Sequence, residues 1–162
     1  MLLICRHAKS SWDDSSLSDF ERPLNKRGER DAPVMGQRLQ TRGFIPDLIV
    51  SSPAARARRT AEIYAQALGY PLAAIRYDKR QYAATWPVLI RLIEELDDRC
   101  QRVFLVGHNP ESTSLANALG GLTLTNIPTA GMVALSFAYS SWADVREQNG
   151  ELLFFDFPKN PF

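Results

Sequence analysis

The chain alternates between short apolar runs, which are typical of β-strands, and longer patterns that place apolar residues on one face of a helix. Strand-like runs occur at Leu2–Arg6, Asp47–Ser51 and Val103–Gly107, with helical patterns between them. This alternation is typical of βαβ units, in which helices cover a mostly parallel sheet. The order of the patterns therefore predicts an α/β fold.

The last two strand-like runs are expected to pair differently. They lie at Met132–Phe137 and Glu151–Phe157, and the Asn149-Gly150 pair between them is typical of a tight hairpin turn. We therefore expect the end of the sheet to be antiparallel. A shorter strand is predicted at Ala74–Tyr77.

Two helices are expected to begin with a capping residue followed by proline, at Ser52-Pro53 and at Asn109-Pro110. Glycine is expected to end the first helix at Gly69 and the second at Gly120-Gly121. Thr85 is expected to cap a further helix, whose apolar face consists of Leu89, Leu92, Ile93 and Leu96.

The helix between the first two strands is less regular, because Pro33 lies inside its pattern. Proline removes a backbone hydrogen bond and disturbs the preceding turn. Two interpretations remain open. Either one helix is kinked at Pro33, or a separate turn near Lys26 precedes a main helix that begins at Asp31.

A chain of 162 residues is expected to form a single domain, residues 1–162, with its own core. The net charge of +1 gives no general attraction to nucleic acid or to an anionic membrane. No apolar run is long enough to span a bilayer, and no secretion signal precedes the first strand-like run. We expect a cytoplasmic monomer.

The two cysteines, Cys5 and Cys100, do not form a disulfide framework and are expected to be inert thiols. Cys5 does not begin a cysteine phosphatase loop, because Ser11 stands where that loop requires arginine. The two cysteines and two histidines also lack the close-paired spacing of a zinc site. We expect no metal and no other cofactor.

The only two histidines each follow a strand-like run: His7 follows Leu2–Arg6, and His108 follows Val103–Gly107. In open α/β sheets, ligands bind at the carboxyl ends of strands. Imidazole is also the side chain best suited to react near neutral pH. We expect the two rings to meet at one site, with Arg6 beside the first.

Two more arginines are placed to join that site: Arg56 near the start of a helix, and Arg22 in the long loop from Ala8 to Asn25. Guanidinium groups bind phosphate oxygens in a fork, and a helix N-terminus also attracts anions. A neutral imidazole can attack phosphorus to form a phosphohistidine that water then hydrolyses. Each residue alone has an ordinary structural interpretation, but their conjunction favours phosphate chemistry.

Three segments also carry a resemblance to a known family. Arg6-His7-Ala8 resembles the Arg-His-Gly signature of the histidine phosphatase (phosphoglycerate mutase-like) superfamily. The stretch from Ser51 to Thr60 is similar to its second arginine motif, and Gly107-His108-Asn109 to its second histidine motif. The short length and the stretch Glu21-Arg22-Pro23-Leu24, followed by Gly28, most resemble SixA-type phosphohistidine phosphatases.

The resemblance implies a three-layer α/β/α fold and a phosphatase that needs no metal. His7 would accept the phosphoryl group, and Arg6, Arg56 and His108 would complete the pocket around it. Arg22 and Asn109 would be further phosphate ligands. One departure is Ala8, which stands where the signature has glycine.

A second departure concerns the proton donor. Superfamily members that cleave phosphoesters carry an acidic donor, usually after the third strand region, but residues 77–84 contain no glutamate. An alkoxide leaving group needs a nearby acid, whereas an imidazole leaving group has a conjugate acid of pKa about 6.5 and needs it far less. This favours P–N substrates, with Asp78, Glu21 and Glu111 left open as donors.

The leading hypothesis is therefore a phosphatase that removes phosphate from phosphohistidine on a partner protein. We expect no helical insertion that would cover the site over a small sugar phosphate, so a histidine on another protein could reach it. The alternatives are a phosphomonoesterase for a small metabolite or phosphopeptide, and a non-catalytic module that binds a phosphoprotein.

Overall fold

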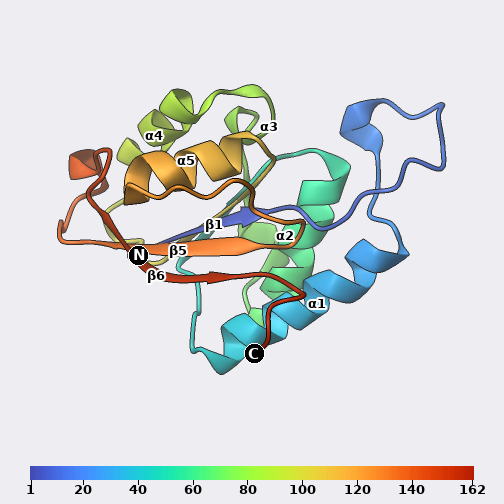
Figure 1. Ribbon diagram of the computed structural model, residues 1–162, viewed down its shortest axis with the longest axis horizontal. Helices are drawn as coiled ribbons and strands as arrows, with labels where there is room; N and C mark the ends of the chain where they lie inside the picture. Colours follow the sequence, from blue (N-terminus) through green and yellow to red (C-terminus); the bar gives the residue numbers. More distant parts are fainter.

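The computed structural model describes all residues from 1 to 162 and contains one six-stranded sheet (Figure 1). The strand order across the sheet is β3-β2-β4-β1-β5-β6. The first four of these strands run parallel to one another, and β5 runs antiparallel to both of its neighbours, β1 and β6. The strands are β1 (Leu2–Arg6), β2 (Leu48–Ser51), β3 (Arg76–Tyr77), β4 (Val103–Gly107), β5 (Met132–Phe137) and β6 (Gly150–Asp156).

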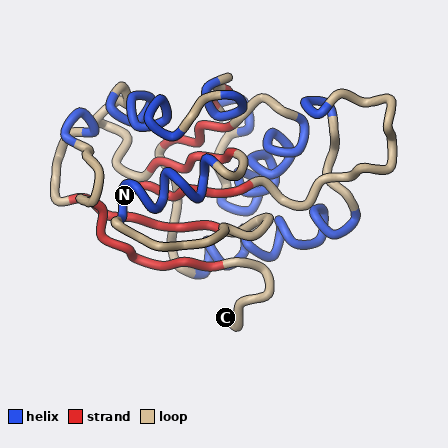
Figure 2. The backbone as a smooth tube through the Cα atoms, turned by 45° about the horizontal axis from the view of Figure 1, so that its top comes forward, coloured by secondary structure: helices blue, strands red, loops and turns tan.

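Helices cover both faces of the sheet, so the expected three-layer α/β/α arrangement is confirmed (Figures 1 and 2). None of the helices is long and apolar enough to cross a membrane. The α-helices are α1 (Lys26–Thr41), α2 (Ala55–Leu68), α3 (Arg80–Ala83), α4 (Trp86–Glu94) and α5 (Glu111–Gly120). Short 3-10 helices are η1 (Asp19–Glu21), η2 (Leu72–Ala74) and η3 (Trp142–Asp144).

Alternate residues of β1 belong to two separate apolar cores, as the period of a strand requires. Leu3 and Cys5 pack on the face covered by α1 and α2, together with Met35 and Tyr64. Leu2 and Ile4 pack on the other face, which α4 and α5 cover. The central strand is therefore buried on both sides, which agrees with its continuous apolar sequence.

The first helix runs without a break from Lys26 to Thr41 and contains Pro33. The interpretation with a separate main helix from Asp31 is therefore wrong. The start is stabilised by Asn25, whose side chain accepts a hydrogen bond from Gly28 N at 2.9 Å.

Both predicted cap-plus-proline starts are wrong. Helix α2 begins at Ala55 rather than at Pro53, and α5 begins at Glu111 rather than at Pro110. The reason is that the polar side chains are engaged elsewhere: Ser52 contacts His108, and Asn109 holds the backbone of Ile127.

The predicted tight turn at Asn149-Gly150 is also wrong, although the antiparallel pairing is confirmed. Phe137 ends β5 and pairs directly with Gly150 at the start of β6, so residues 138–149 form the connection. This longer connection is stabilised because Trp142 and Val145 are buried in the core beneath it. The predicted strand at Ala74–Tyr77 is shorter than expected, because η2 takes up residues 72–74.

Gly28 packs against the backbone that leads out of β1, and this contact yields a test of the fold. A Cβ at this position would lie 2.2 Å from the carbonyl oxygen of Lys9. Alanine normally favours a helix over glycine by about 1 kcal/mol, but here Gly28→Ala should destabilise the protein by about 1–3 kcal/mol through overpacking.

The measurement is urea unfolding followed by circular dichroism. Gln37→Ala is the control, because Gln37 is exposed on the same helix and its substitution should change the free energy of unfolding little. Equal or greater stability of Gly28→Ala would contradict the close packing of Lys9 on this helix.

Candidate active site

The two histidine rings lie side by side at the carboxyl ends of β1 and β4. Their centroids are 4.9 Å apart, with an angle of 54° between the ring planes. Each side chain is buried, with a residue exposure of 8%. The backbone N–H of His7 donates to the carbonyl of Gly107 at 2.9 Å, so the strand pairing itself holds the two residues together.

The His7 ring is oriented by its own backbone. Nδ1 lies 2.7 Å from the carbonyl oxygen of Ala8, which can only accept a hydrogen bond, so Nδ1 carries the proton. Nε2 therefore carries a lone pair that can accept a hydrogen bond. Arg56 Nε donates toward that atom at 3.3 Å.

Ala8 fits where the family signature has glycine. Its φ is not positive, and its side chain is fully buried in the core. Its N–H donates to Thr60 Oγ1 at 3.0 Å, which ties the segment after β1 to helix α2. The backbone does not require glycine here, because the φ angle is not positive and the methyl group fits in the core.

The His108 ring is oriented by Ser52. Nε2 lies 2.8 Å from Ser52 Oγ, and the same oxygen accepts from Ala54 N at 3.2 Å. A serine hydroxyl can both donate and accept, so this contact fixes the direction of the ring but not the position of its proton. Nδ1 is buried and has no partner in the protein, so it is free to hydrogen-bond a bound group.

Burial keeps both imidazoles neutral. The pKa of His7 is lowered to about 4, mainly by burial and also by the charges of Arg56, Arg6 and Arg22, while the hydrogen bond to the carbonyl of Ala8 partly opposes this shift. Burial also lowers the pKa of His108 to about 3, with His7 as the next cause. A neutral His7 is able to act as a nucleophile at neutral pH.

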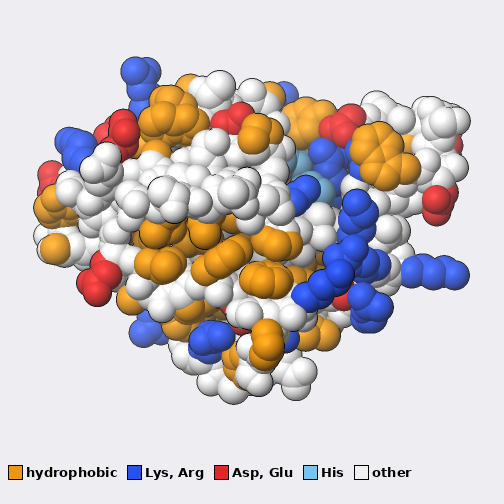
Figure 3. Space-filling model, in the orientation of Figure 1, with side chains coloured by type: hydrophobic (Ala, Val, Ile, Leu, Met, Phe, Trp, Pro, Cys, Tyr) orange, Lys and Arg blue, Asp and Glu red, His pale blue; other side chains and the backbone are white.

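A small cavity of about 180 Å³ opens beside the His7 ring, whereas His108 lies behind His7 and does not line it. In the space-filling view, the histidines lie in a recess bordered by lysine and arginine side chains (Figure 3). Arg6 contributes a buried Nε that has no partner in the protein, while its Nη1 donates to the carbonyl of Ile127 at 2.9 Å. The cavity is lined by Arg6, His7, Lys9, Ser10, Trp12, Arg22, Arg56 and Thr129.

Arg22 lines the cavity, but the long loop engages all of its nitrogens. Nε donates to the carbonyl of Ser11 at 2.9 Å, Nη1 to Asp19 at 2.9 Å, and Nη2 to Ser10 Oγ. The indole of Trp12 lies over the guanidinium, 3.2 Å from ring centroid to Cζ. Arg22 therefore orders the loop at the mouth of the cavity.

Asp19 is a residue of this site that the sequence reasoning missed. Its carboxylate contacts both Arg22 and Arg56, and it accepts a hydrogen bond from the hydroxyl of Tyr82 at 3.1 Å. Burial alone would raise its pKa, but the hydrogen bond and charge of Arg56 outweigh this effect and hold the pKa below its usual value. The one available signal was its position three residues before Arg22.

The other candidate residues lie outside the cavity. Asn109 donates from its amide to Ile127 O at 3.0 Å and does not line the cavity, so its role as a phosphate ligand stays a prediction. Glu21 binds Ser18, Asp78 binds Arg80, and Glu111 accepts from the backbone of Trp86. None of these three carboxylates contacts either histidine.

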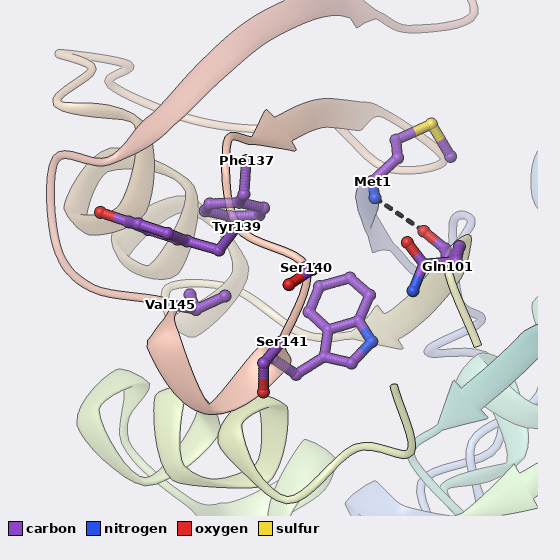
Figure 4. Close-up of a pocket in the computed structure, with 8 residues that line it drawn as sticks. Met1, Gln101, Phe137, Tyr139, Ser140, Ser141 and Val145 are labelled. Atoms are coloured by element: carbon purple, nitrogen blue, oxygen red, sulfur yellow. Dashed lines mark hydrogen bonds between the residues drawn. The ribbon is translucent and has the colours of Figure 1, made fainter. Parts of the chain in front are cut away.

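A second, smaller pocket of about 60 Å³ lies at the opposite end of the sheet, near Met1 (Figure 4). The ammonium group of Met1 donates to the carbonyl of Gln101 at 2.7 Å. The remaining lining is aromatic, aliphatic and hydroxyl-bearing, and contains no histidine or arginine. The chemistry-bearing residues therefore gather at the carboxyl ends of the strands, as in other open α/β sheets.

Comparison with known sequences gives a family for this arrangement. Residues 2–80 match the model of the histidine phosphatase superfamily (branch 1). An uncharacterized protein of Mycobacterium tuberculosis is 32% identical over 164 residues, which cover 95% of this chain and 99% of the relative. The uncharacterized phosphatase PhoE of Bacillus subtilis is 27% identical over 179 residues, covering 88% of this chain and 92% of the relative.

Solved structures agree in fold. The candidate phosphohistidine phosphatase SixA of Agrobacterium tumefaciens superposes with a TM-score of 0.80 at 29% identity, over 97% of both chains. A protein histidine phosphatase SixA in complex with tungstate superposes with a TM-score of 0.82 at 20% identity, over 97% of this chain and 96% of the other. Together with the two neutral histidines and their arginines, these similarities establish that the chain belongs to the histidine phosphatase superfamily.

Proposed function

We propose that this phosphatase removes phosphate from histidine on a partner protein, with His7 as the transient phosphoryl acceptor. The observation that carries the proposal is the pairing of a neutral His7 Nε2 with an arginine-lined cavity that has no protonated carboxyl group beside it. The two SixA structures support the same substrate class, because both are described as histidine phosphatases.

The reaction has two displacements at phosphorus. The lone pair of His7 Nε2 attacks phosphorus, and the P–N bond of the substrate breaks with its electron pair passing to the departing nitrogen. The other nitrogen of the substrate ring carries a proton, so the ring leaves as neutral imidazole. Water then attacks phosphorus and releases a proton to solvent, the electron pair of the P–N bond returns to His7 Nε2, and orthophosphate leaves. Each step spreads negative charge over the equatorial phosphoryl oxygens.

Positive charge and unpartnered donors would stabilise those oxygens. Arg6 Nε and His108 Nδ1 are buried without partners, and Arg56 donates beside His7. Donors that are already aimed at developing charge stabilise a transition state without reorganisation. The proposal therefore includes a reaction that proceeds without a metal ion.

The absence of an available acid favours P–N over P–O cleavage. Asp19 is the carboxyl group that reaches the cavity arginines, and its low pKa keeps it deprotonated and unable to protonate an alkoxide. An imidazole leaving group needs no strong acid, because its conjugate acid has a pKa of about 6.5.

The size of the cavity favours a substrate that stays largely outside it. Pockets for drug-sized ligands usually occupy about 300–1,000 Å³, whereas this cavity occupies about 180 Å³. A phosphoryl group carried on an exposed histidine would enter alone, while its carrier protein remained at the surface. Lys9 and Trp12 lie where that carrier would touch.

The first prediction concerns substrate and nucleophile. The wild type should release phosphate rapidly from a phosphohistidine peptide and slowly from a matched phosphoserine peptide, with chelator present throughout. His7→Ala should abolish release, because the other neutral imidazole, His108, does not line the cavity and its Nε2 is hydrogen-bonded to Ser52. The thermal unfolding of this variant should confirm that the fold is intact. Phosphate release is measured for both peptides with both proteins.

Faster release from phosphoserine would replace this proposal with a phosphomonoesterase. Binding of the phosphohistidine peptide by the wild type without any release would instead identify a non-catalytic module. Full activity of His7→Ala would disprove the covalent mechanism.

The second prediction concerns Arg56. Its charged hydrogen bonds to a phosphoryl group should contribute roughly 1.5–3 kcal/mol each, so Arg56→Ala should lower kcat/KM at least about tenfold. Arg58→Ala is the matched control, because Arg58 lies on the same helix but stacks on Tyr77, away from the cavity. Equal activity of the two variants would place Arg56 outside the catalytic machinery.

The third prediction concerns pH. Because folding lowers both histidine pKa values from about 6.5, the unfolded chain binds more protons than the folded chain between about pH 6.5 and pH 4. The free energy of unfolding should therefore fall as the pH falls through this range. In the double variant His7→Gln/His108→Gln, the free energy of unfolding should decrease less over the same pH range.

The measurement is urea unfolding of both proteins at several pH values within this range. Both proteins contain the same carboxyl groups, so the difference between the two curves reports on the histidines. Parallel curves would mean that the histidines are not held neutral by the fold.

A further inference from the structure

We propose that Asp19 is a positioning residue of the active site, which holds Arg56 in the orientation that points its Nε toward His7 Nε2. The inference rests on the proposed function, because it assigns Arg56 to the phosphoryl group. It adds a residue outside the two histidine motifs and the arginine motif, contributed by the loop between β1 and α1.

Asp19 binds the two terminal nitrogens of Arg56 with its backbone carbonyl and its carboxylate. Its backbone carbonyl accepts from Arg56 Nη1, and its carboxylate Oδ2 accepts from Arg56 Nη2 at 2.9 Å. A planar guanidinium that is hydrogen-bonded at both terminal nitrogens has a fixed orientation. The N–H on Nε then points at His7 Nε2 at 3.3 Å, and each terminal nitrogen keeps a second N–H.

The same carboxylate links Arg56 to two other elements. Oδ1 accepts from Arg22 Nη1 at 2.9 Å, and Oδ2 accepts from the hydroxyl of Tyr82 on α3 at 3.1 Å. Phe20, the next residue, packs edge-on against Tyr82, with ring centroids 5.0 Å apart. Asp19 is therefore held in place from both sides, although half of its side chain is exposed.

Asp19 holds the arginines without filling the cavity. The cavity is lined by His7, Arg6, Arg22 and Arg56 but not by Asp19, so it is open while every Asp19 contact is in place. An oxyanion can therefore enter without displacing the carboxylate. This distinguishes a positioning residue from a carboxylate that competes with phosphate for the arginines.

The physical benefit of such a contact is preorganisation. A free arginine side chain has many rotamers and loses them when it binds an anion, whereas Arg56 is already fixed before substrate arrives. Fixed donors also give more transition-state stabilisation than donors that must reorient during the reaction. Removal of Asp19 should therefore weaken phosphate binding and slow the chemical step.

The experiment compares Asp19→Ala, Asp19→Asn and Asp19→Glu with Asp13→Asn, a matched control in the same loop whose carboxylate is exposed and makes no side-chain contact. Affinity for inorganic phosphate is measured by calorimetry, and kcat and KM with the phosphohistidine peptide. Asp19→Ala should bind inorganic phosphate more weakly and lower kcat about tenfold, the loss expected for a charged hydrogen bond. Asp19→Glu should recover part of both, and Asp13→Asn should match the wild type.

A double-mutant cycle with Arg56→Ala tests whether Asp19 acts through Arg56. If Asp19 acts through Arg56, Asp19→Ala should cost little once Arg56 is already gone. A full, multiplicative loss in that background would overturn the proposal. So would tighter binding of inorganic phosphate by Asp19→Ala, which would identify Asp19 as a competitor.

Two safeguards keep the test decisive. Should Asp19→Ala fail to fold, the isosteric Asp19→Asn carries the same comparison, because it removes the charge and keeps the shape. Binding of inorganic phosphate needs no turnover. It therefore tests the positioning role of Asp19 separately from the proposal that phosphohistidine is the substrate.

Discussion

The parallel pairing of β1 with β4 is the constraint on which the rest of the site depends. Its register sets Arg6 opposite Gly107, so the next residue of each strand, His7 and His108, leaves the sheet at the same level. A slip of one residue would turn each side chain to the opposite face of the sheet. Two histidines distant in sequence thereby become one site through backbone hydrogen bonds in the core.

Burial of that site creates an electrostatic problem that the loop between β1 and α1 resolves. The same low-dielectric surroundings that keep both imidazoles neutral also make unpaired arginines costly. Asp19 offsets this cost for Arg22 and Arg56 at once. A long loop in a compact domain is usually functional, and here it carries the counter-charge of the arginines that are proposed to bind phosphate.

The main strands and the convergence of the histidines could be predicted because they depend on local patterns. Apolar runs mark buried strands, and the residue after such a run lies at the ligand-binding edge of the sheet. Asp19 and Tyr82 could not be predicted in this way. They come from a loop and a one-turn helix without periodicity, and the ion pair between Asp19 and Arg56 spans 37 positions of the chain.

The helix starts that sequence rules place wrongly are informative for the same reason. Ser52 and Asn109 are good N-caps by residue type, yet neither caps a helix. Ser52 instead hydrogen-bonds His108 Nε2, and Asn109 holds the segment that binds Arg6. Sequence rules for helix caps tend to fail where the side chain belongs to a functional site. Both failures flank the proposed phosphoryl pocket, which itself argues that these helix starts are shaped by chemistry rather than by helix stability.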